Sequence, residues 1–398
     1  MIREKKEKWS RLVTDWYPRH GKRIKEDRTE TSNCFTSLSK QFVDNYYDIF
    51  TKVVDEALAR IPYLDSNEIK DRIKKMAGYY ALERKPMLAE LFLHAYEMLE
   101  QPENYNEEKK NQAYALACAM EMGTSYFLFI DDMEDDGKTR CGKPCWHLLP
   151  DAGPLTWNDT SMLRSFIHEL LLQNFPETLS FRIVEFVNQI YFLSAVGQHL
   201  DISTSEKQNY KNFTVDYYYK INEVKVSFFA IQAPIIFALI LANKDTNEAK
   251  QQVHNVCNDV GVFIQIKNDL MDLYDSNEFK SSTDIQKGKC SWLAVKALEI
   301  CNKEQRKIFQ ENYGNWDKSC VRKIQELYDT LKIQDIYEEE KQTQYENFLK
   351  KINNLPSNAV PSADIYKKLI SNDITIRDKN RGNLASFMLA GNETIISC

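Results

Sequence analysis

Tyr126-Phe-Leu-Phe-Ile-Asp-Asp-Met-Glu-Asp-Asp-Gly-Lys-Thr-Arg140 is the stretch from which the rest of the chain is interpreted. An apolar run leads directly into five acids within six positions. Asp131 and Asp135 are four residues apart, so they share a face of a helix, and so do Asp132 and Asp136. Like charges at this spacing repel by roughly 0.2–0.5 kcal/mol per pair, a cost that a bound cation would offset.

Two interpretations of these acids compete. A solvated acidic helix end is the simpler one. The other is a Mg²⁺ site, because Mg²⁺ prefers oxygen ligands and binds one or two carboxylates together with substrate phosphates. Lys138, Arg140 and Lys143 follow at once. Acids that can hold a metal next to bases that can hold phosphate favour the second interpretation.

Composition limits the class of protein. The chain has 398 residues, of which 43% are hydrophobic, so a large core is available. Its 12 glycines and 11 prolines are too few for a sandwich of many short strands. The net charge of −6, with both signs mixed, gives no support to nucleic-acid binding. Nine scattered cysteines suggest reduced thiols rather than a disulfide framework.

The N-terminal stretch has no apolar run for a signal peptide, and its acids count against a transit peptide. We therefore expect a cytoplasmic protein. The apolar run 226–242 contains Gln232 and Pro234 and is short for a membrane span. It is more consistent with a buried core helix, so no stable membrane span is expected.

Apolar residues recur at helical spacing along most of the chain, and strand-like alternation is nearly absent. We predict an all-α fold, with one large helical bundle over 36–353 between a polar arm (1–35) and a polar C-terminal extension (354–398). The helix over 110–136 is apolar nearly all round and should be central. A loop is predicted over 137–158, and later helices include 177–197, 205–223, 224–242 and 246–275.

A second acid cluster ends another predicted helix. Asn268 and Asp272 are four residues apart and share a face, with Asp269 beside them. Two such helices facing each other across a bundle would form one cage for several divalent ions.

Three lysines extend this pattern. Lys287 and Lys289 flank a glycine just after the second acid cluster, and Lys225 begins the most apolar helix. Each alone is more often a surface charge. Together with the acids, they suggest a pocket for a diphosphate attached to an apolar tail.

Four segments, in order, resemble motifs of the trans-isoprenyl diphosphate synthases of the farnesyl diphosphate synthase type. Asp-Asp-Met-Glu-Asp matches the family's Asp-Asp-x-x-Asp, and the other three are similar to its Thr-Arg-Arg-Gly-x-Pro-Cys-Trp, Gly-Gln-x-Leu-Asp and Thr-Asp-Ile-Gln-x-x-Lys-Cys-x-Trp. In this chain they occupy 131–135, 139–146, 197–201 and 283–292.

The resemblance implies an all-α isoprenoid synthase bundle, a homodimer and three Mg²⁺ ions that bind a prenyl diphosphate. It assigns metal ligation to Asp131, Asp132, Asp135, Asn268, Asp269 and Asp272. Arg140, Lys225 and Lys289 would bind the diphosphate and complete the catalytic set with the first three aspartates. Tyr126 and Phe127 would form the pocket floor, with Phe228 and Gln265 in its wall. Phe229 is interpreted as ordinary core.

The family's clamp for a second substrate, isopentenyl diphosphate, is altered. Its Gly-Gly-Lys-x-x-Arg falls on residues 83–88, where Lys85 is kept and Leu88 replaces arginine. Thr124 stands at a glutamine position and Cys141 at an arginine position. Each lost charge-assisted bond is worth about 1.5–3 kcal/mol.

These losses favour a terpene synthase, resembling insect terpene synthases derived from farnesyl diphosphate synthases. Such an enzyme would ionise farnesyl diphosphate, and the carbocation would cyclise, lose a proton or take up water to give a sesquiterpene. One alternative is a farnesyl or geranyl diphosphate synthase that tolerates the losses. Another is a non-catalytic partner subunit of a prenyl synthase, which the intact first motif disfavours.

Overall fold

The central helix is α6 (Glu107–Glu134), which the side chain of Asn106 caps by accepting the backbone N–H of Lys109 at 2.8 Å. In the computed structural model the described residues are 37–100, 104, 106–206, 210–274 and 283–371. Every residue of α6 from 113 to 125 is buried. Helices α3, α4, α5 and α7 pack around it. The all-α fold predicted from the sequence is confirmed, since helices make up nearly all of the regular structure in the described residues.

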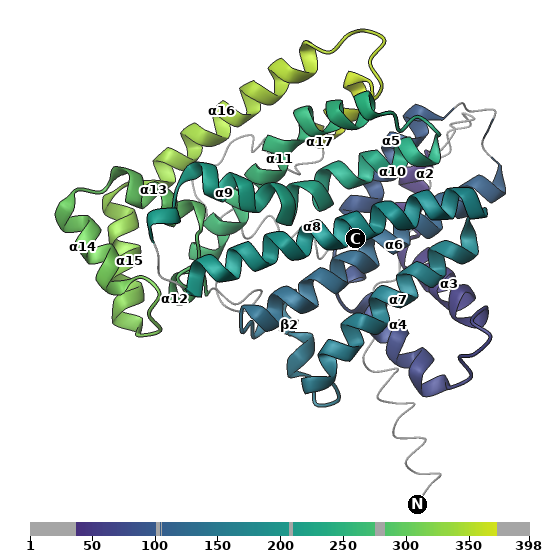
Figure 1. Ribbon diagram of the computed structural model, residues 1–398, viewed down its shortest axis with the longest axis horizontal. Coiled ribbons are helices and arrows are strands. Elements are labelled where there is room, and N and C mark those ends of the chain that lie inside the picture. Colours follow the sequence, from purple (N-terminus) through teal and green to yellow (C-terminus); the bar gives the residue numbers. More distant parts are fainter. Residues whose placement is uncertain (1–36, 101–103, 105, 207–209, 275–282, 372–398) are drawn as a thin grey trace, which may run out of the picture. The chain divides into compact units, whose positions relative to one another are not determined.

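The other helices follow in chain order (Figure 1). The first half contains α2 (Leu38–Asp44), α3 (Tyr46–Ala59), α4 (Asn67–Ala81), α5 (Met87–Leu99), α7 (Thr156–Asn174) and α8 (Glu177–Glu206). The second contains α9 (Val215–Asn222), η5 (Glu223–Gln232), α10 (Ala233–Leu241), α11 (Asn247–Tyr274), α12 (Asp284–Lys287), α13 (Trp292–Ile300), α14 (Lys303–Asn312), α15 (Lys318–Thr330), α16 (Ile333–Asn353) and α17 (Ala363–Ser371).

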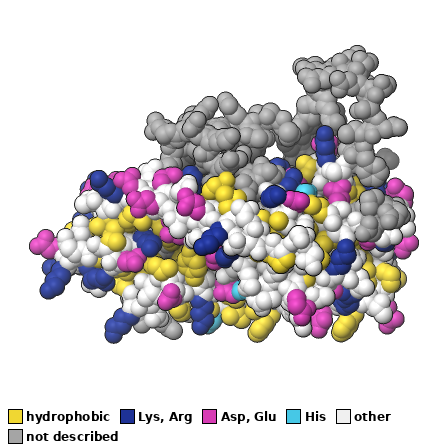
Figure 2. All heavy atoms as spheres, turned by 90° about the horizontal axis from the view of Figure 1, so that it is seen from above, with side chains coloured by type: hydrophobic (Ala, Val, Ile, Leu, Met, Phe, Trp, Pro, Cys, Tyr) yellow, Lys and Arg dark blue, Asp and Glu magenta, His cyan; other side chains and the backbone are white. Residues whose placement is uncertain are grey.

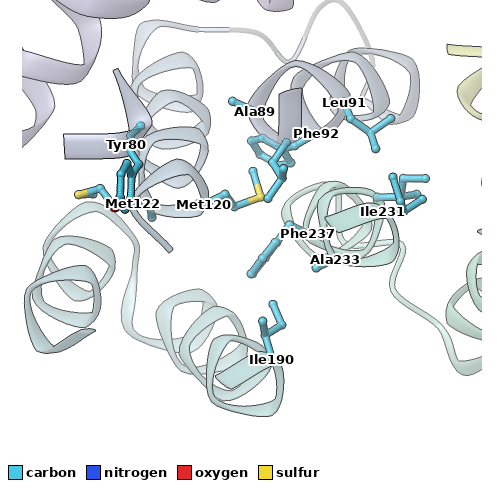
Figure 3. Packing of buried hydrophobic residues seen from close by; sticks show 14 of the residues in the cluster. Tyr80, Ala89, Leu91, Phe92, Met120, Met122, Ile190, Ile231, Ala233 and Phe237 are labelled. Carbon is cyan, nitrogen blue, oxygen red and sulfur yellow. The ribbon is translucent and has the colours of Figure 1, made fainter. Parts of the chain in front are cut away.

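The core lies between α6 and the helices that cover it. Figure 3 shows Met120 of α6 pointing toward Phe92 of α5, and Met122 toward Tyr80 of α4. All four side chains are at most 5% exposed. Burying side chains of this size contributes about 1.5–3 kcal/mol each, so α6 is held rigidly along its length.

The helix η5 is a π-helix, in which the chain makes i→i+5 turns, and it lies between α8 and α11. Glycines on both neighbours allow this close approach. A Cβ atom on Gly197 of α8 would lie 2.6 Å from the backbone nitrogen of Lys225, and one on Gly261 of α11 would lie 2.4 Å from the Cα atom of Ser227. These two close approaches fix the position of η5 relative to α8 and α11, and with it the position of Lys225.

Two predicted elements differ in the structure. The helix expected over 205–223 is divided, because α8 continues to Glu206 and a short 3₁₀ turn (Tyr210–Asn212) precedes α9. The loop expected over 137–158 contains a small antiparallel sheet of β1 (Thr139–Arg140) and β2 (Lys143–Pro144), followed by two 3₁₀ turns and the start of α7. Strands of two residues leave no alternation in the sequence, so they could not be predicted from it.

The C-terminal extension predicted from residue 354 contains a packed helix. Helix α17 packs on α5 and α16, and its Ile365, Tyr366 and Leu369 are at most 1% exposed. Its three apolar side chains recur at helical spacing within a polar stretch, a signal too short to stand out. The predicted arm (1–35) and residues 372–398 lie outside the described residues, so these parts of the division into domains stay predictions. The cytoplasmic location also stays a prediction.

Two stretches are long and apolar enough to cross a membrane, Glu107–Glu134 and Val215–Leu241. Their most apolar windows are 78% and 61% buried within the protein, as core helices are, and no clear membrane span is present among the described residues. On the face in Figure 2, basic and acidic side chains are interspersed, as the mixed charge of the sequence predicts.

Candidate active site

The acids that end α6 lie at the negative end of a helix dipole. The N–H of Asp135 caps the helix by donating to the carbonyls of Asp131 and Met133. Carboxylates at a helix C-terminus are disfavoured by the exposed carbonyl dipoles. Asp131 and Asp135 are half-buried there, whereas Asp136 is exposed. This end of the helix therefore requires cations.

Arg140 bridges the first two aspartates. Its Nη2 lies 2.8 Å from a carboxylate oxygen of Asp131, and its Nε lies 2.6 Å from Asp132. Asp132 is 2% exposed and also accepts the hydroxyl of Tyr80 at 2.6 Å. Burial raises the pKa of Asp132, although Arg140 and Tyr80 oppose the rise. The resemblance assigned metal ligation to Asp132. Its contacts instead favour a role in which Asp132 positions Arg140.

A tight hairpin presents Arg140. The loop between β1 and β2 consists of Cys141 and Gly142, with φ of 54° and 70°. Positive φ at both positions is what a type I′ turn requires, and it is uncommon for a non-glycine residue such as Cys141. Arg140 pairs with Lys143 across the hairpin, so the two cations emerge on the same face of the small sheet.

Asp201 of α8 joins the two predicted diphosphate lysines. It lies 2.6 Å from Nζ of Lys225 and 3.8 Å from Nζ of Lys289. Lys225 is also 3.3 Å from Asp131, and Lys289 forms an ion pair with Asp135. Burial alone would lower the pKa of both lysines, but the surrounding carboxylates raise it above the usual value. Both lysines therefore stay charged, and the structure brings the three predicted cations to the first acid cluster.

The second acid cluster is partly brought to this site. Asp272 is buried, and its Oδ2 accepts the backbone N–H of Asp284 at 3.2 Å. Asp284 in turn lies 3.9 Å from Nζ of Lys289. Asn268 is exposed. The contacts through Asp284 and Lys289 thus connect Asp272 to the first cluster.

Asp269 has a different environment. Its carboxylate accepts the hydroxyl of Tyr218 at 2.9 Å, the N–H of Trp292 at 2.8 Å and the side-chain amide of Gln265 at 2.7 Å. Burial raises its pKa to about 7. The three hydrogen bonds favour a structural role that joins α9, α11 and α13 over metal ligation by Asp269, and they place Gln265 as its partner.

The aromatic residues predicted to line the pocket lie one turn below the acids. The ring centres of Phe127 and Phe229 are 4.8 Å apart, and those of Tyr126 and Phe127 are 5.1 Å apart. Phe228 packs against Phe186 of α8 at 5.7 Å. The structure therefore places Phe229, which we had interpreted as core, against Phe127, and it places Phe228 against α8.

The region expected to lack a second clamp contains further cations. Burial raises the pKa of the Cys141 thiol, while the positive charges of Arg84, Arg140 and Lys143 oppose the rise, so all three act on this position. Lys143 lies 2.8 Å from Glu83. Lys85 is exposed and pairs with Glu90 at 3.3 Å.

Leu88 and Thr124, the other altered clamp positions, are buried in the protein. The hydroxyl of Thr124 donates to the carbonyl of Met120 at 3.4 Å. Neither supplies a charge, so the cations of this region come from residues 84, 85 and 143.

The residues present fit a divalent metal. Carboxylates outnumber bases among the described residues that contact one another here: Asp131, Asp132, Asp135, Asp201, Asp272 and Asp284 against Arg140, Lys225 and Lys289. No three metal-binding side chains among the described residues converge on one point. Mg²⁺ does not need three, because it keeps several waters and takes phosphate oxygens. Asp131, in the last turn of α6, and Asp135, its C-cap residue, are the best-placed ligands.

Sequence reasoning had assigned no role to several residues of this site. They are Tyr80, Arg84, Gln198, Asp201 and Asp284. The side-chain amide of Gln198 donates to Asp131 at 3.2 Å. Gln198, Asp201 and Asp284 lie inside quoted motifs, which was a signal for a role. Arg84 lies in the altered segment 83–88, which was a signal too, whereas Tyr80 carries none, because it reaches the site only through the packing of α4 on α6.

Residues 70–331 match the family described as Polyprenyl synthetase. The chain belongs to the polyprenyl synthetase family. It is 32% identical to the farnesyl pyrophosphate synthase of Artemisia annua, over 83% of this chain and 98% of that protein. It is 30% identical to farnesyl pyrophosphate synthase 1 of Parthenium argentatum, over 83% and 99%. The T. brucei farnesyl diphosphate synthase complexed with risedronate has the same fold, with a TM-score of 0.76 and 23% identity over 86% of this chain and 100% of that one.

The prediction of a terpene synthase is wrong. Relatives at about 30% identity over nearly their whole length are named farnesyl pyrophosphate synthases, which supports the prenyltransferase alternative. The prediction counted losses at single positions, Leu88, Thr124 and Cys141. It gave no weight to Arg84, inside the altered segment 83–88, or to Lys143, two residues after Cys141, whose positive charges both act on this position in the folded chain.

Proposed function

We propose that this protein condenses an allylic diphosphate with isopentenyl diphosphate to form farnesyl diphosphate. The observation that carries the proposal is the similarity to farnesyl pyrophosphate synthases, which extends over 98–99% of the length of two of them. The cations gathered around the acid cluster supply the electrostatic part of such a reaction.

In the proposed reaction the carbon–oxygen bond of the allylic diphosphate breaks, and the diphosphate leaves with the electron pair. The double bond of isopentenyl diphosphate attacks the allylic carbon, a carbon–carbon bond forms, and a proton is lost. Arg140, Lys225 and Lys289 stay charged and stabilise the negative charge that develops on the leaving group. The rings of Phe127 and Phe229 exclude water from the cation.

Mg²⁺ is the metal that this donor set favours, because all of its ligands are hard oxygens. Asp131, Asp135 and Asp272 would hold it, and it would supply Lewis-acid stabilisation of the leaving diphosphate. In the present geometry Asp131 and Asp135 are paired with Arg140, Lys225 and Lys289. With Asp131 and Asp135 committed to metal, Arg140, Lys225 and Lys289 would be free to bind phosphate.

Arg84, Lys85 and Lys143 would bind the diphosphate of isopentenyl diphosphate. The charges of the first and third act on Cys141, which stands at a position where the family has an arginine. We expect Arg84→Met to raise the KM for isopentenyl diphosphate by roughly tenfold, the equivalent of one charge-assisted bond of about 1.4 kcal/mol, with little change in the KM for the allylic substrate. Lys74→Met is the matched control, because Lys74 pairs with Asp55 on the exposed side of α4.

One assay tests the proposed function. Purified protein is incubated with Mg²⁺, geranyl diphosphate and isopentenyl diphosphate, and in parallel with farnesyl diphosphate alone. Farnesyl diphosphate formed only in the first mixture supports the proposal. Hydrocarbon or terpene alcohol formed in the second mixture, without condensation in the first, contradicts it. If no product forms in either mixture, the protein would instead be a non-catalytic partner subunit of a prenyl synthase.

We also propose that the protein is a homodimer. A groove of ≈ 620 Å³ between α7 and α8 is lined by Leu172, Phe181 and Phe192, whose surfaces are 52–69% exposed. An apolar surface of this kind favours burial against another protein surface. Phe181→Glu with Phe192→Glu should convert a dimer to a monomer in light scattering, whereas Trp316→Glu, at an equally exposed ring beyond α14, should not. A wild-type monomer at micromolar concentration would contradict the proposal.

A further inference from the structure

The end of α6 and the start of η5 run in opposite directions past each other. Asp131 of α6 lies 3.3 Å from Lys225 of η5, and one turn farther along both helices Phe127 meets Phe229. The next turn of α6 continues the contact, because a Cβ atom on Gly123 would lie 3.8 Å from the Phe229 ring. An apolar tail whose diphosphate is held at the upper contact must therefore meet the aromatic rings of the lower one.

These rings form part of a larger cluster. Tyr191 of α8 contacts Tyr126 at 4.9 Å and Phe127 at 5.6 Å. Tyr191 is buried, whereas Tyr126 and Phe127 are only partly so. The cluster of Tyr126, Phe127, Tyr191 and Phe229, here called the aromatic floor, thus joins α6, α8 and η5.

Arg164 of α7 supports this floor from behind. Its guanidinium carbon lies 4.6 Å from the centre of the Tyr191 ring, a cation–π contact. The guanidinium also lies beside the Tyr126 hydroxyl: burial raises the pKa of Tyr126, and Arg164 opposes the rise through its charge and a hydrogen bond. Asn188 of α8 accepts from the same guanidinium at 3.4 Å. One side chain therefore fixes both tyrosines.

An open space lies behind the floor. A cleft of ≈ 380 Å³ is lined by Tyr126, Arg164, His168 and three hydroxyl residues of α7. Burial and the neighbouring Arg164 lower the pKa of His168, so this cleft holds a neutral imidazole. Tyr126 is the one residue shared by the aromatic floor and the cleft wall, so its orientation decides whether a chain that reaches the floor can enter the cleft.

We propose that Arg164 is a positioning residue that determines product length. It holds the rings of Tyr126 and Tyr191 in place, where they block the path of the growing chain. The inference rests on the proposed condensation reaction. Without Arg164, Tyr126 can turn aside, and a longer prenyl chain can extend into the cleft. The residue touches no reacting atom and acts only through the two tyrosines.

The test is the length distribution of products. Wild type and Arg164→Ala are incubated with geranyl diphosphate and excess isopentenyl diphosphate, and the products are separated by chain length after dephosphorylation. We expect the ratio of products longer than farnesyl to farnesyl to rise by roughly tenfold, which corresponds to about 1.4 kcal/mol. Arg164→Lys, which keeps the cation but not the planar fork, should give an intermediate ratio.

Two further variants separate positioning from a general loss of structure. Ser161→Ala alters the same cleft away from the rings and should leave product length unchanged. Tyr126→Ala should lengthen the product by itself, and adding Arg164→Ala to it should lengthen the product by less than Arg164→Ala does alone. An unchanged distribution in both Arg164 variants, or fully additive effects in the double variant, would overturn the inference. A wild type that forms no condensation product would instead refute the proposed function.

Discussion

Gly261→Ala is the substitution whose effect the structure specifies most closely. Gly261 lies inside α11, where its missing side chain lets η5 approach. A Cβ atom there would lie 2.4 Å from Cα, Cβ and Oγ of Ser227. An ordinary contact needs at least 3.4 Å, so α11 and η5 would have to separate by about 1 Å, more than well-packed helices allow without strain.

The magnitude follows from two opposing terms. Alanine is favoured over glycine in a helix by about 0.8–1.0 kcal/mol. Overpacking of a core costs about 1–3 kcal/mol, and occasionally more. Gly123→Ala in α6 gains the same propensity without the clash, since its Cβ would meet only the Phe229 ring, at 3.8 Å. The difference between the two variants therefore isolates the clash, and we expect Gly261→Ala to be less stable than Gly123→Ala by about 3 kcal/mol.

Urea unfolding followed by circular dichroism measures both variants against wild type. Because Lys225 lies two residues before Ser227, the displaced η5 should also weaken the contacts of Lys225 with Asp131 and Asp201 and lower kcat. Ser227→Gly should not rescue Gly261→Ala, since the Cα atom of Ser227 remains in the way. Equal stability of the two alanine variants would refute the argument that glycine is required for the approach of η5.

Three further predictions concern buried charge and metal. Arg72→Met leaves the carboxylate of Asp159, which is 1% exposed, without the guanidinium that binds it at 2.6 and 2.7 Å, and should cost about 3–5 kcal/mol in urea unfolding; a cost below 1 kcal/mol would contradict a buried ion pair. Burial raises the pKa of Glu121 from 4.5 to about 7, so the folded state holds a proton that the unfolded state releases, and stability falls as the pH rises from about 4.5 through 7. Glu121→Gln should therefore gain about 3 kcal/mol relative to wild type between these limits, and a difference that does not change with pH would refute the shift. Asp135→Asn should raise the Mg²⁺ concentration for half-maximal activity by at least roughly tenfold, the equivalent of about 1.4 kcal/mol, whereas the exposed Asp136→Asn should change it little; equal effects would argue against Asp135 as a ligand.

The sequence was sufficient wherever the decisive interactions are local. Helical spacing predicted the central helix α6, because the pattern depends only on residues a few positions apart on one helix. The apolar run of α6 predicted its burial for the same reason. Asp135, predicted to share a helical face with Asp131, is the C-cap residue just beyond the helix. The family resemblance assigned Arg140, Lys225 and Lys289 to the diphosphate, and the structure places all three at the acid cluster.

The tertiary structure decided everything that depends on residues far apart in the chain. The π-helix η5 exists where glycines of two other helices let it approach, so the sequence of η5 alone could not predict it. The resemblance assigned Asp269 to metal, but Tyr218 and Trp292, which both donate to its Oδ2, come from other helices. The choice of reaction failed for the same physical reason: a diphosphate responds to the total charge around it. Arg84, from a distant part of the chain, brings its charge to bear on Cys141 only in the folded protein.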